Sequence, residues 1–164
     1  MEFNSEDYVT QLLNYVVKYK NYVFEWLVND EDDETYIPKV DFDYTIIDCK
    51  ENSNLNSTQV WRELMEREDP LIFTNTTYLF NQFKNAKMFN QSIEDGAQAF
   101  AQCFYFFFRD KMWQEKKIKF IFLVTEENID KMYQFVNSGF SIELIPRCFK
   151  KDRIKEDEKI KKIK

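Results

Sequence analysis

The second half of the chain alternates buried apolar runs with helical patterns, and this alternation limits the fold more than any other feature. The run IKFIFLV (118–124) is almost wholly apolar, as expected for a strand covered on both faces. A pattern that is apolar almost all round begins at Gly96 and predicts a buried helix before this strand. A further helix (126–138) and a strand (140–149) are predicted after it. This order predicts an α/β fold with a single mixed central sheet flanked by helices.

The first half contains weaker versions of the same signals. Apolar residues at helical spacing predict one long N-terminal helix over 6–28, and FDYTIIDC (42–49) alternates as a strand does. A short helix is predicted over 58–69, where Pro70 stops it. The β-branched and aromatic run 71–80 predicts a strand, which we expect to pair in a hairpin with 83–90.

The predicted N-terminal helix carries an aromatic stripe beside its aliphatic one. Helices with so broad an apolar surface usually have two packing partners, and Tyr and Trp are favoured at interfaces. We therefore consider the stripe a candidate protein-partner interface, with the alternative that both stripes face the chain's own core. The stripe consists of Tyr8, Tyr15, Tyr19, Tyr22 and Trp26.

Length and charge suggest one domain with a tail. A chain of 164 residues fits a single domain, which we place at 1–149, followed by a charged, frayed helical tail at 150–164. Residues 147–164 hold nine basic and four acidic residues (+5), so residues 1–146 sum to −11 within the net charge of −6. Lys150, Lys151 and Arg153 are candidate contacts for weak nucleic-acid binding that is not sequence-specific.

Other classes of site find little support. The chain has no histidine, which excludes the Ser-His-Asp and Cys-His catalytic arrangements and disfavours zinc. Asp41, Asp43 and Asp48 around a predicted strand could bind a divalent cation, but acids that flank a strand edge more often serve solubility, so we expect no metal. Three widely spaced cysteines and no apolar run near 20 residues predict buried thiols, no membrane span, and a cytoplasmic or nuclear location.

The two glycines of the chain lie in a pattern that resembles the GNAT acetyltransferase superfamily. Asn128 follows the predicted strand, and Gly139 with Phe140 ends the next helix at the family's spacing, with Phe135 in the usual Tyr place. Gln91 and Gly96 stand at the first and last places of the family's Q/R-x-x-G-x-G/A loop, whose backbone receives the pyrophosphate of acetyl-CoA. The resemblance implies a GNAT-like fold and Gln91, Gly96 and Asn128 as the cofactor-binding residues if acetyl-CoA binds.

Several positions depart from that family's chemistry. Glu94 replaces the middle glycine of the loop and Asp95 follows it, which places two carboxylates where a pyrophosphate would bind. Phe135 lacks the hydroxyl of the family's general acid, and 80–90 offers no acid residue as a base. We assign no catalytic residue.

Three functions follow from these patterns. The first is a non-catalytic GNAT-like subunit of a larger complex, a pseudoenzyme without cofactor that acts through contacts with one or more protein subunits. The second is a divergent, active N-acetyltransferase that uses acetyl-CoA, and the third is a nucleic-acid-associated subunit that uses its basic tail.

Overall fold

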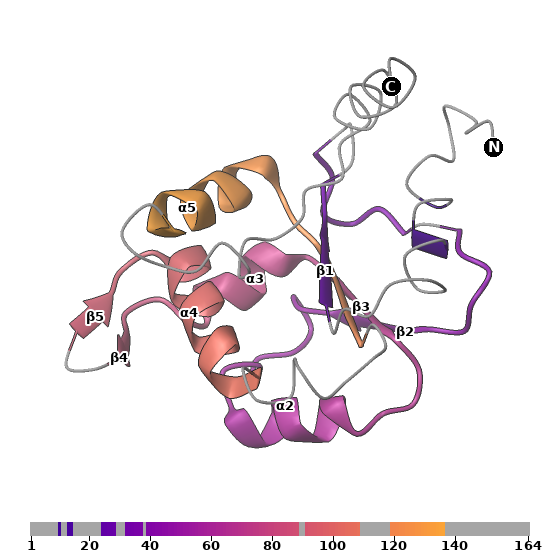
Figure 1. The fold of residues 1–164 in the computed structure, drawn as a ribbon, viewed down its shortest axis with the longest axis horizontal. Helices are drawn as coiled ribbons and strands as arrows, with labels where there is room; N and C mark the ends of the chain where they lie inside the picture. Colours follow the sequence, from indigo (N-terminus) through magenta and orange to yellow (C-terminus); the bar gives the residue numbers. More distant parts are fainter. Residues whose placement is uncertain are drawn as a thin grey trace, which may run out of the picture.

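Four parallel strands form the central sheet of the computed structural model, which describes residues 10, 13–14, 24–28, 32–37, 39–88, 91–108 and 119–136 (Figure 1). The strands are β1 (Phe24–Leu27), β2 (Thr45–Asp48), β3 (Leu71–Thr74) and β6 (Phe120–Leu123), in the spatial order β1-β6-β3-β2. Each neighbouring pair is parallel. The α/β class is therefore confirmed, and within the described residues a parallel sheet replaces the mixed sheet that we expected.

The remaining elements connect these strands. Helix α2 (Thr58–Met65) joins β2 to β3, and α5 (Glu126–Val136) follows β6. Between β3 and β6 the chain forms a helix, a hairpin and a longer helix: α3 (Thr76–Asn81), β4 (Ala86–Met88), β5 (Gln91–Ile93) and α4 (Gly96–Phe108). Figure 1 shows these helices on one side of the sheet.

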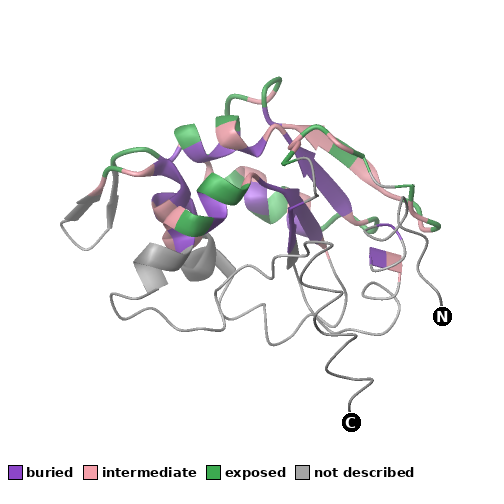
Figure 2. Cartoon of the chain, turned by 90° about the horizontal axis from the view of Figure 1, so that it is seen from above, coloured by how far each residue is buried: buried purple, intermediate pink, exposed green. Residues whose placement is uncertain are grey.

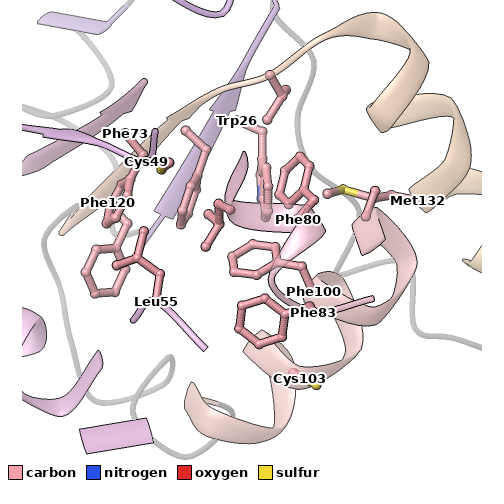
Figure 3. Packing of buried hydrophobic residues seen from close by; sticks show 14 of the residues in the cluster. Trp26, Cys49, Leu55, Phe73, Phe80, Phe83, Phe100, Cys103, Phe120 and Met132 are labelled. Carbon is pink, nitrogen blue, oxygen red and sulfur yellow. The ribbon is translucent and has the colours of Figure 1, made fainter. Parts of the chain in front are cut away.

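The helix-covered face of the sheet carries a row of large rings. The parallel register places Trp26 beside Phe122 and Phe122 beside Phe73. Their neighbouring rings stack with centroids 4.5 and 4.7 Å apart. Trp61 of α2 stacks on Phe73, and Phe100 of α4 meets Phe122 edge to face. Figure 3 labels Trp26, Phe73 and Phe100 among the buried side chains of this cluster. Burial of these rings supplies the main hydrophobic stabilisation of the fold.

The opposite face of the sheet is aliphatic. Leu27, Ile72, Ile121 and Leu123 form a second buried cluster with Leu13. Val40, Phe42 and Tyr44, from the segment that precedes β2, pack partly buried against it. Because β3 and β6 are covered on both faces, every residue of both strands is buried, as the purple ribbon in Figure 2 shows. This explains why the run 118–124 lacks the alternation of a half-exposed strand.

Several predicted elements are confirmed. β2 falls within 42–49, β6 within 118–124, and α2 begins at Thr58 as expected. α4 begins at Gly96 and α5 at Glu126, also as expected. The predicted strand 140–149 and the charged tail 150–164 lie outside the described residues.

The prediction of one helix over 6–28 is wrong at its end. Thr10, Leu13 and Asn14 are helical, but Phe24–Leu27 form strand β1. The backbone of β1 pairs with β6 along its whole length, and its side chains alternate between the two faces, with Trp26 in one core cluster and Leu27 in the other. Helical and strand spacing are hard to separate in an apolar run this short, so the tertiary pairing decides.

The predicted strand 71–80 is wrong in its second half. β3 ends at Thr74, Asn75 takes a left-handed conformation (φ 53°, ψ 45°), and α3 follows. The expected hairpin with 83–90 is also wrong, because β4 pairs with β5 in a separate two-stranded sheet. Asn is one of the few residues that adopts this left-handed conformation readily, and it turns the chain from strand to helix.

Among the described residues, no helix combines the length and the apolar composition needed to cross a membrane. Both described cysteines, Cys49 and Cys103, are buried free thiols.

We expect Phe100→Ala to lower the free energy of unfolding by about 3–5 kcal/mol, because Phe100 has no exposed surface and its ring meets the rings of Trp26, Trp61, Phe80 and Phe83. Urea denaturation followed by tryptophan fluorescence measures the change. Tyr78→Ala, at an exposed position, is the control and should cost under about 1 kcal/mol. Equal effects of the two changes would contradict the assignment of Phe100 to the core.

Candidate functional site at the carboxyl end of the sheet

The carboxyl ends of the four parallel strands meet at one edge of the sheet, which is where open parallel sheets generally bind ligands. Asp48 ends β2, Asn75 follows β3, and Asn128 lies in the first turn of the helix after β6. The segment 32–37 reaches the same edge, where Glu34 contacts the start of α3. We call Glu34, Asp48, Asn75, Thr77 and Asn128 the carboxyl-edge network.

Glu34 bonds the start of α3 through two parts of the residue. Its Oε2 accepts hydrogen bonds from the Thr77 backbone N–H (3.1 Å) and from Thr77 Oγ1 (2.7 Å). Its backbone carbonyl accepts a bond from the Asn75 N–H (3.0 Å). A carboxylate at this position satisfies a helix N–H that has no partner within the helix and interacts favourably with the positive end of the helix dipole.

Asn75 and Asn128 extend the network on either side of Glu34. Asn75 donates from Nδ2 to Asp48 Oδ1 (2.9 Å), which joins the ends of β2 and β3. Asn128, only 9% exposed, donates from Nδ2 to Thr77 Oγ1 (3.2 Å) and therefore links α5 to α3. The backbone N–H of Asn128 donates a hydrogen bond to Thr125 Oγ1 (3.3 Å). The network thus connects the ends of β2 and β3 and links helices α3 and α5 with hydrogen bonds inside the protein.

Cys49 lies beside this network but is not poised to react. Burial raises the pKa of its thiol, and the negative charges of Asp48 and Glu34 raise the pKa further. The nucleophilic form of cysteine is the thiolate, which needs a lowered pKa. Cys49 is therefore a neutral core thiol.

Helices α4 and α5 each have a carboxylate of the chain at their N-terminus. Asp95 accepts a hydrogen bond from the Gln98 N–H at the start of α4 (2.9 Å) and lies 3.5 Å from Lys131 Nζ. Asp32 accepts a bond from the Glu126 N–H at the start of α5 (2.6 Å). At each of these helix starts, one N–H group that could attract an anion is bonded to an acid side chain of the protein.

Gly96 is required by packing against α3. A Cβ at this position would lie 2.2 Å from the backbone oxygen of Phe80 and 2.7 Å from its carbonyl carbon. The close approach of α4 to α3 therefore excludes every side chain at residue 96.

Two of the three predicted cofactor residues make contacts with α3. Gly96 packs against the backbone of Phe80, and Asn128 donates a hydrogen bond to Thr77, so both residues contact α3. Gln91 is the first residue of β5, and its side chain lies outside the described residues.

The predicted interface stripe is corrected at one position. Trp26 is 2% exposed and stacks on Phe122 in the core, so it does not face a partner. Tyr8, Tyr15, Tyr19 and Tyr22 lie outside the described residues, as do the candidate nucleic-acid contacts Lys150, Lys151 and Arg153.

The prediction from sequence missed Glu34, Asn75 and Thr77. Glu34 belongs to an acidic run that looks like a solvated loop, and nothing in the sequence tells it from its neighbours. The triplet Asn75-Thr76-Thr77 did contain a usable signal, since Asn and Thr are favoured before helix starts. In the part of the chain that the structure describes, no group of three or more His, Cys, Asp or Glu residues could hold a metal ion.

Comparison with known proteins returned no match to a family model, to a curated protein or to a solved structure.

We expect Gly96→Ala to destabilise the protein by about 3 kcal/mol, because the methyl group would overlap the Phe80 carbonyl and force α4 away from α3. Chemical denaturation measures the loss. The matched control is Ala97→Gly in the same helical turn, which tests helix propensity and the loss of one small methyl group and should cost about 1 kcal/mol. If Gly96→Ala leaves the free energy of unfolding unchanged, α4 can move away from α3 without cost, which would contradict the prediction.

We expect Thr77→Val to lower the free energy of unfolding by about 1–3 kcal/mol, because it removes the hydroxyl between Glu34 and Asn128 at nearly constant volume. Thr77→Ser retains the hydroxyl and is the control, with a loss of under about 1 kcal/mol expected. Urea midpoints of the two variants give the comparison. If Thr77→Ser and Thr77→Val lower the free energy of unfolding equally, the hydrogen bonds of Thr77 do not stabilise the carboxyl-edge network.

Proposed function

We propose that this chain is a non-catalytic α/β subunit that acts through contacts with other proteins and does not use acetyl-CoA. The observation that carries the proposal is the carboxylate of Asp95 at the start of α4, where a GNAT-like enzyme would bind pyrophosphate. An anion placed there would have to displace this carboxylate from the Gln98 N–H and would meet its charge at short range.

The other residues that a cofactor would need support the same conclusion. The absence of a side chain at Gly96 is explained by the Phe80 carbonyl, and the amide of Asn128 is bonded to Thr77. Gly96 and Asn128, two of the three residues that suggested a cofactor, therefore have structural roles of their own. Neither role depends on a ligand.

The described residues also do not point to a general acid or a general base. Residue 135, in α5, is phenylalanine and has no proton to donate to a leaving thiolate. The carboxylates of the edge accept hydrogen bonds from neutral side chains, Asp48 from Asn75 and Glu34 from Thr77. Each carboxylate therefore has a structural partner within the protein.

Thermal melting with acetyl-CoA tests the proposal. We expect no rise in the melting temperature of the full chain at millimolar acetyl-CoA, because a ligand stabilises a protein only if it binds the folded state. An acetyltransferase of known affinity, melted under the same conditions, is the positive control. A ligand at 100 times its Kd stabilises by about 2.7 kcal/mol, so a functioning site would give a clear upward shift.

Asp95→Asn is the matched variant for this experiment. It removes the charge but retains an oxygen that can accept from the Gln98 N–H. An upward shift with acetyl-CoA in the wild-type chain would overturn the proposal. A shift in the variant alone would show that the carboxylate is what prevents binding, in agreement with it.

A further inference from the structure

Strand β2 forms one end of the central sheet. Within the described residues it pairs only with β3, on one of its two sides. The N–H groups of Thr45 and Cys49 point toward β3, since they bond the carbonyls of Pro70 and Thr74, both at 3.0 Å. Because N–H groups alternate in direction along a strand, those of Ile46 and Asp48 point away from the sheet. This edge therefore presents backbone groups that can pair with another strand.

The side chains beside this edge are apolar at the centre and mostly acidic around it. Ile46 is 40% exposed and is one of three exposed large apolar side chains among the described residues. The register with Ile72 places it on the aliphatic face, where the partly buried Phe42 and Tyr44 also pack. Residues 39–51 contain four acids and two lysines, a local net charge of −2. Of the acids, Asp41, Asp43 and Glu51 are exposed.

β2 is short and ends in the charged Asp48, but it lacks three other devices that protect a free edge. Natural edge strands are commonly blocked by proline, by lysine within the strand or by a bulge. β2 has the sequence TIID, without proline or lysine, and its four residues pair with β3 in continuous register. Only its end is closed, where the carbonyl of Asp48 accepts from Asn52 Nδ2 (2.7 Å) and from the Glu51 N–H (3.1 Å).

We propose that the free edge of β2 is the docking site for an extended, lysine- or arginine-rich segment of a partner protein, which adds a strand to the sheet. The backbone of the segment bonds the outward groups of Ile46 and the N–H of Asp48. An apolar side chain of the segment covers Ile46, and its basic side chains lie near Asp41, Asp43 and Glu51. This inference rests on the proposed function, because it names the surface through which such a subunit acts.

The charge of the site selects the partner. A neutral or acidic strand could use the same backbone groups, but it would gain nothing from the acids around Ile46 or would be repelled by them. Surface charges of this kind change affinity modestly and association rate more strongly, and salt screens both effects. We therefore expect the binding of a basic strand to weaken as the salt concentration rises.

Amide hydrogen exchange of the full chain, followed by NMR, tests the inference. The probe is a hexapeptide of alternating lysine and valine, and the matched control is the same peptide with glutamate in place of lysine. We expect the lysine peptide to slow exchange at the amides of Ile46 and Asp48 at least tenfold, and the glutamate peptide to leave them unchanged. The amide of Thr45, already bonded to Pro70, is the internal reference.

Two variants separate the backbone and charge contributions. Ile46→Pro removes an outward N–H without removing a bond to β3 and should abolish protection at Asp48; circular dichroism checks that the variant is folded. The double variant Asp41→Asn, Asp43→Asn should lower the affinity for the lysine peptide roughly two- to tenfold and leave the fold intact. If Ile46→Pro fails to fold, the double Asn variant alone decides the role of charge.

Four outcomes would overturn the inference. The first is a lack of protection by the lysine peptide at millimolar concentration, and the second is equal protection by both peptides. The third is protection that grows with protein concentration without peptide, which would assign the edge to a second copy of the chain. The fourth is protection of both amides in the free monomer, which would mean that the chain already covers its own edge. All four are read at β2 and are independent of acetyl-CoA, so they are distinguishable from a failure of the proposed function.

Discussion

The stacked row of Trp26, Phe122 and Phe73 is the interaction on which the rest of the structure depends. Three strands that are far apart in the sequence contribute one ring each, and the rings stack at 4.5 and 4.7 Å. Stacking at these distances requires the parallel register that pairs Trp26 with Phe122 and Phe122 with Phe73. The helices then cover this row with rings of their own, including Trp61 and Phe100. Among the described residues, eight aromatic side chains are buried inside the fold: Trp26, Trp61, Phe73, Phe80, Phe83, Phe100, Phe120 and Phe122.

Helix α3 is the second organising element, although it has only six residues. Gly96 of α4 packs against its Phe80 carbonyl, and Asn128 of α5 bonds its Thr77. Glu34, which precedes α3 in the sequence, accepts hydrogen bonds from the backbone N–H and the hydroxyl of the same threonine. Gly96 and Asn128, two of the three residues in the GNAT-like pattern, thus connect two longer helices to a short one. Glycine and asparagine serve close packing and helix starts as readily as they serve ligands.

The elements that could be predicted from sequence were those whose signal is local and long. The helix from Gly96 and the strand 118–124 are confirmed because each repeats one period, or one apolar run, over several residues. The wrong predictions concern segments whose residue pattern suits both a helix and a strand. Phe24–Leu27 continue a helical pattern yet form a strand, and Thr76–Asn81 are rich in β-branched and aromatic residues yet form a helix. Pairing with β6 decides the first case, and the left-handed Asn75 with the Glu34 carboxylate decides the second.

The amino-acid sequence by itself determined that this chain forms an α/β core, because its apolar runs are too continuous for half-exposed strands and its helical stripes are too wide for a free surface. It also determined that histidine-based catalysis is absent, since no histidine occurs. Only the tertiary structure decided that the strands of the four-stranded sheet are parallel, that Trp26 belongs to the core, and that the carboxylate of Asp32 occupies the start of α5. The physical reason is that these features depend on contacts between residues distant in the chain, such as Glu126 with Asp32, which no local pattern encodes.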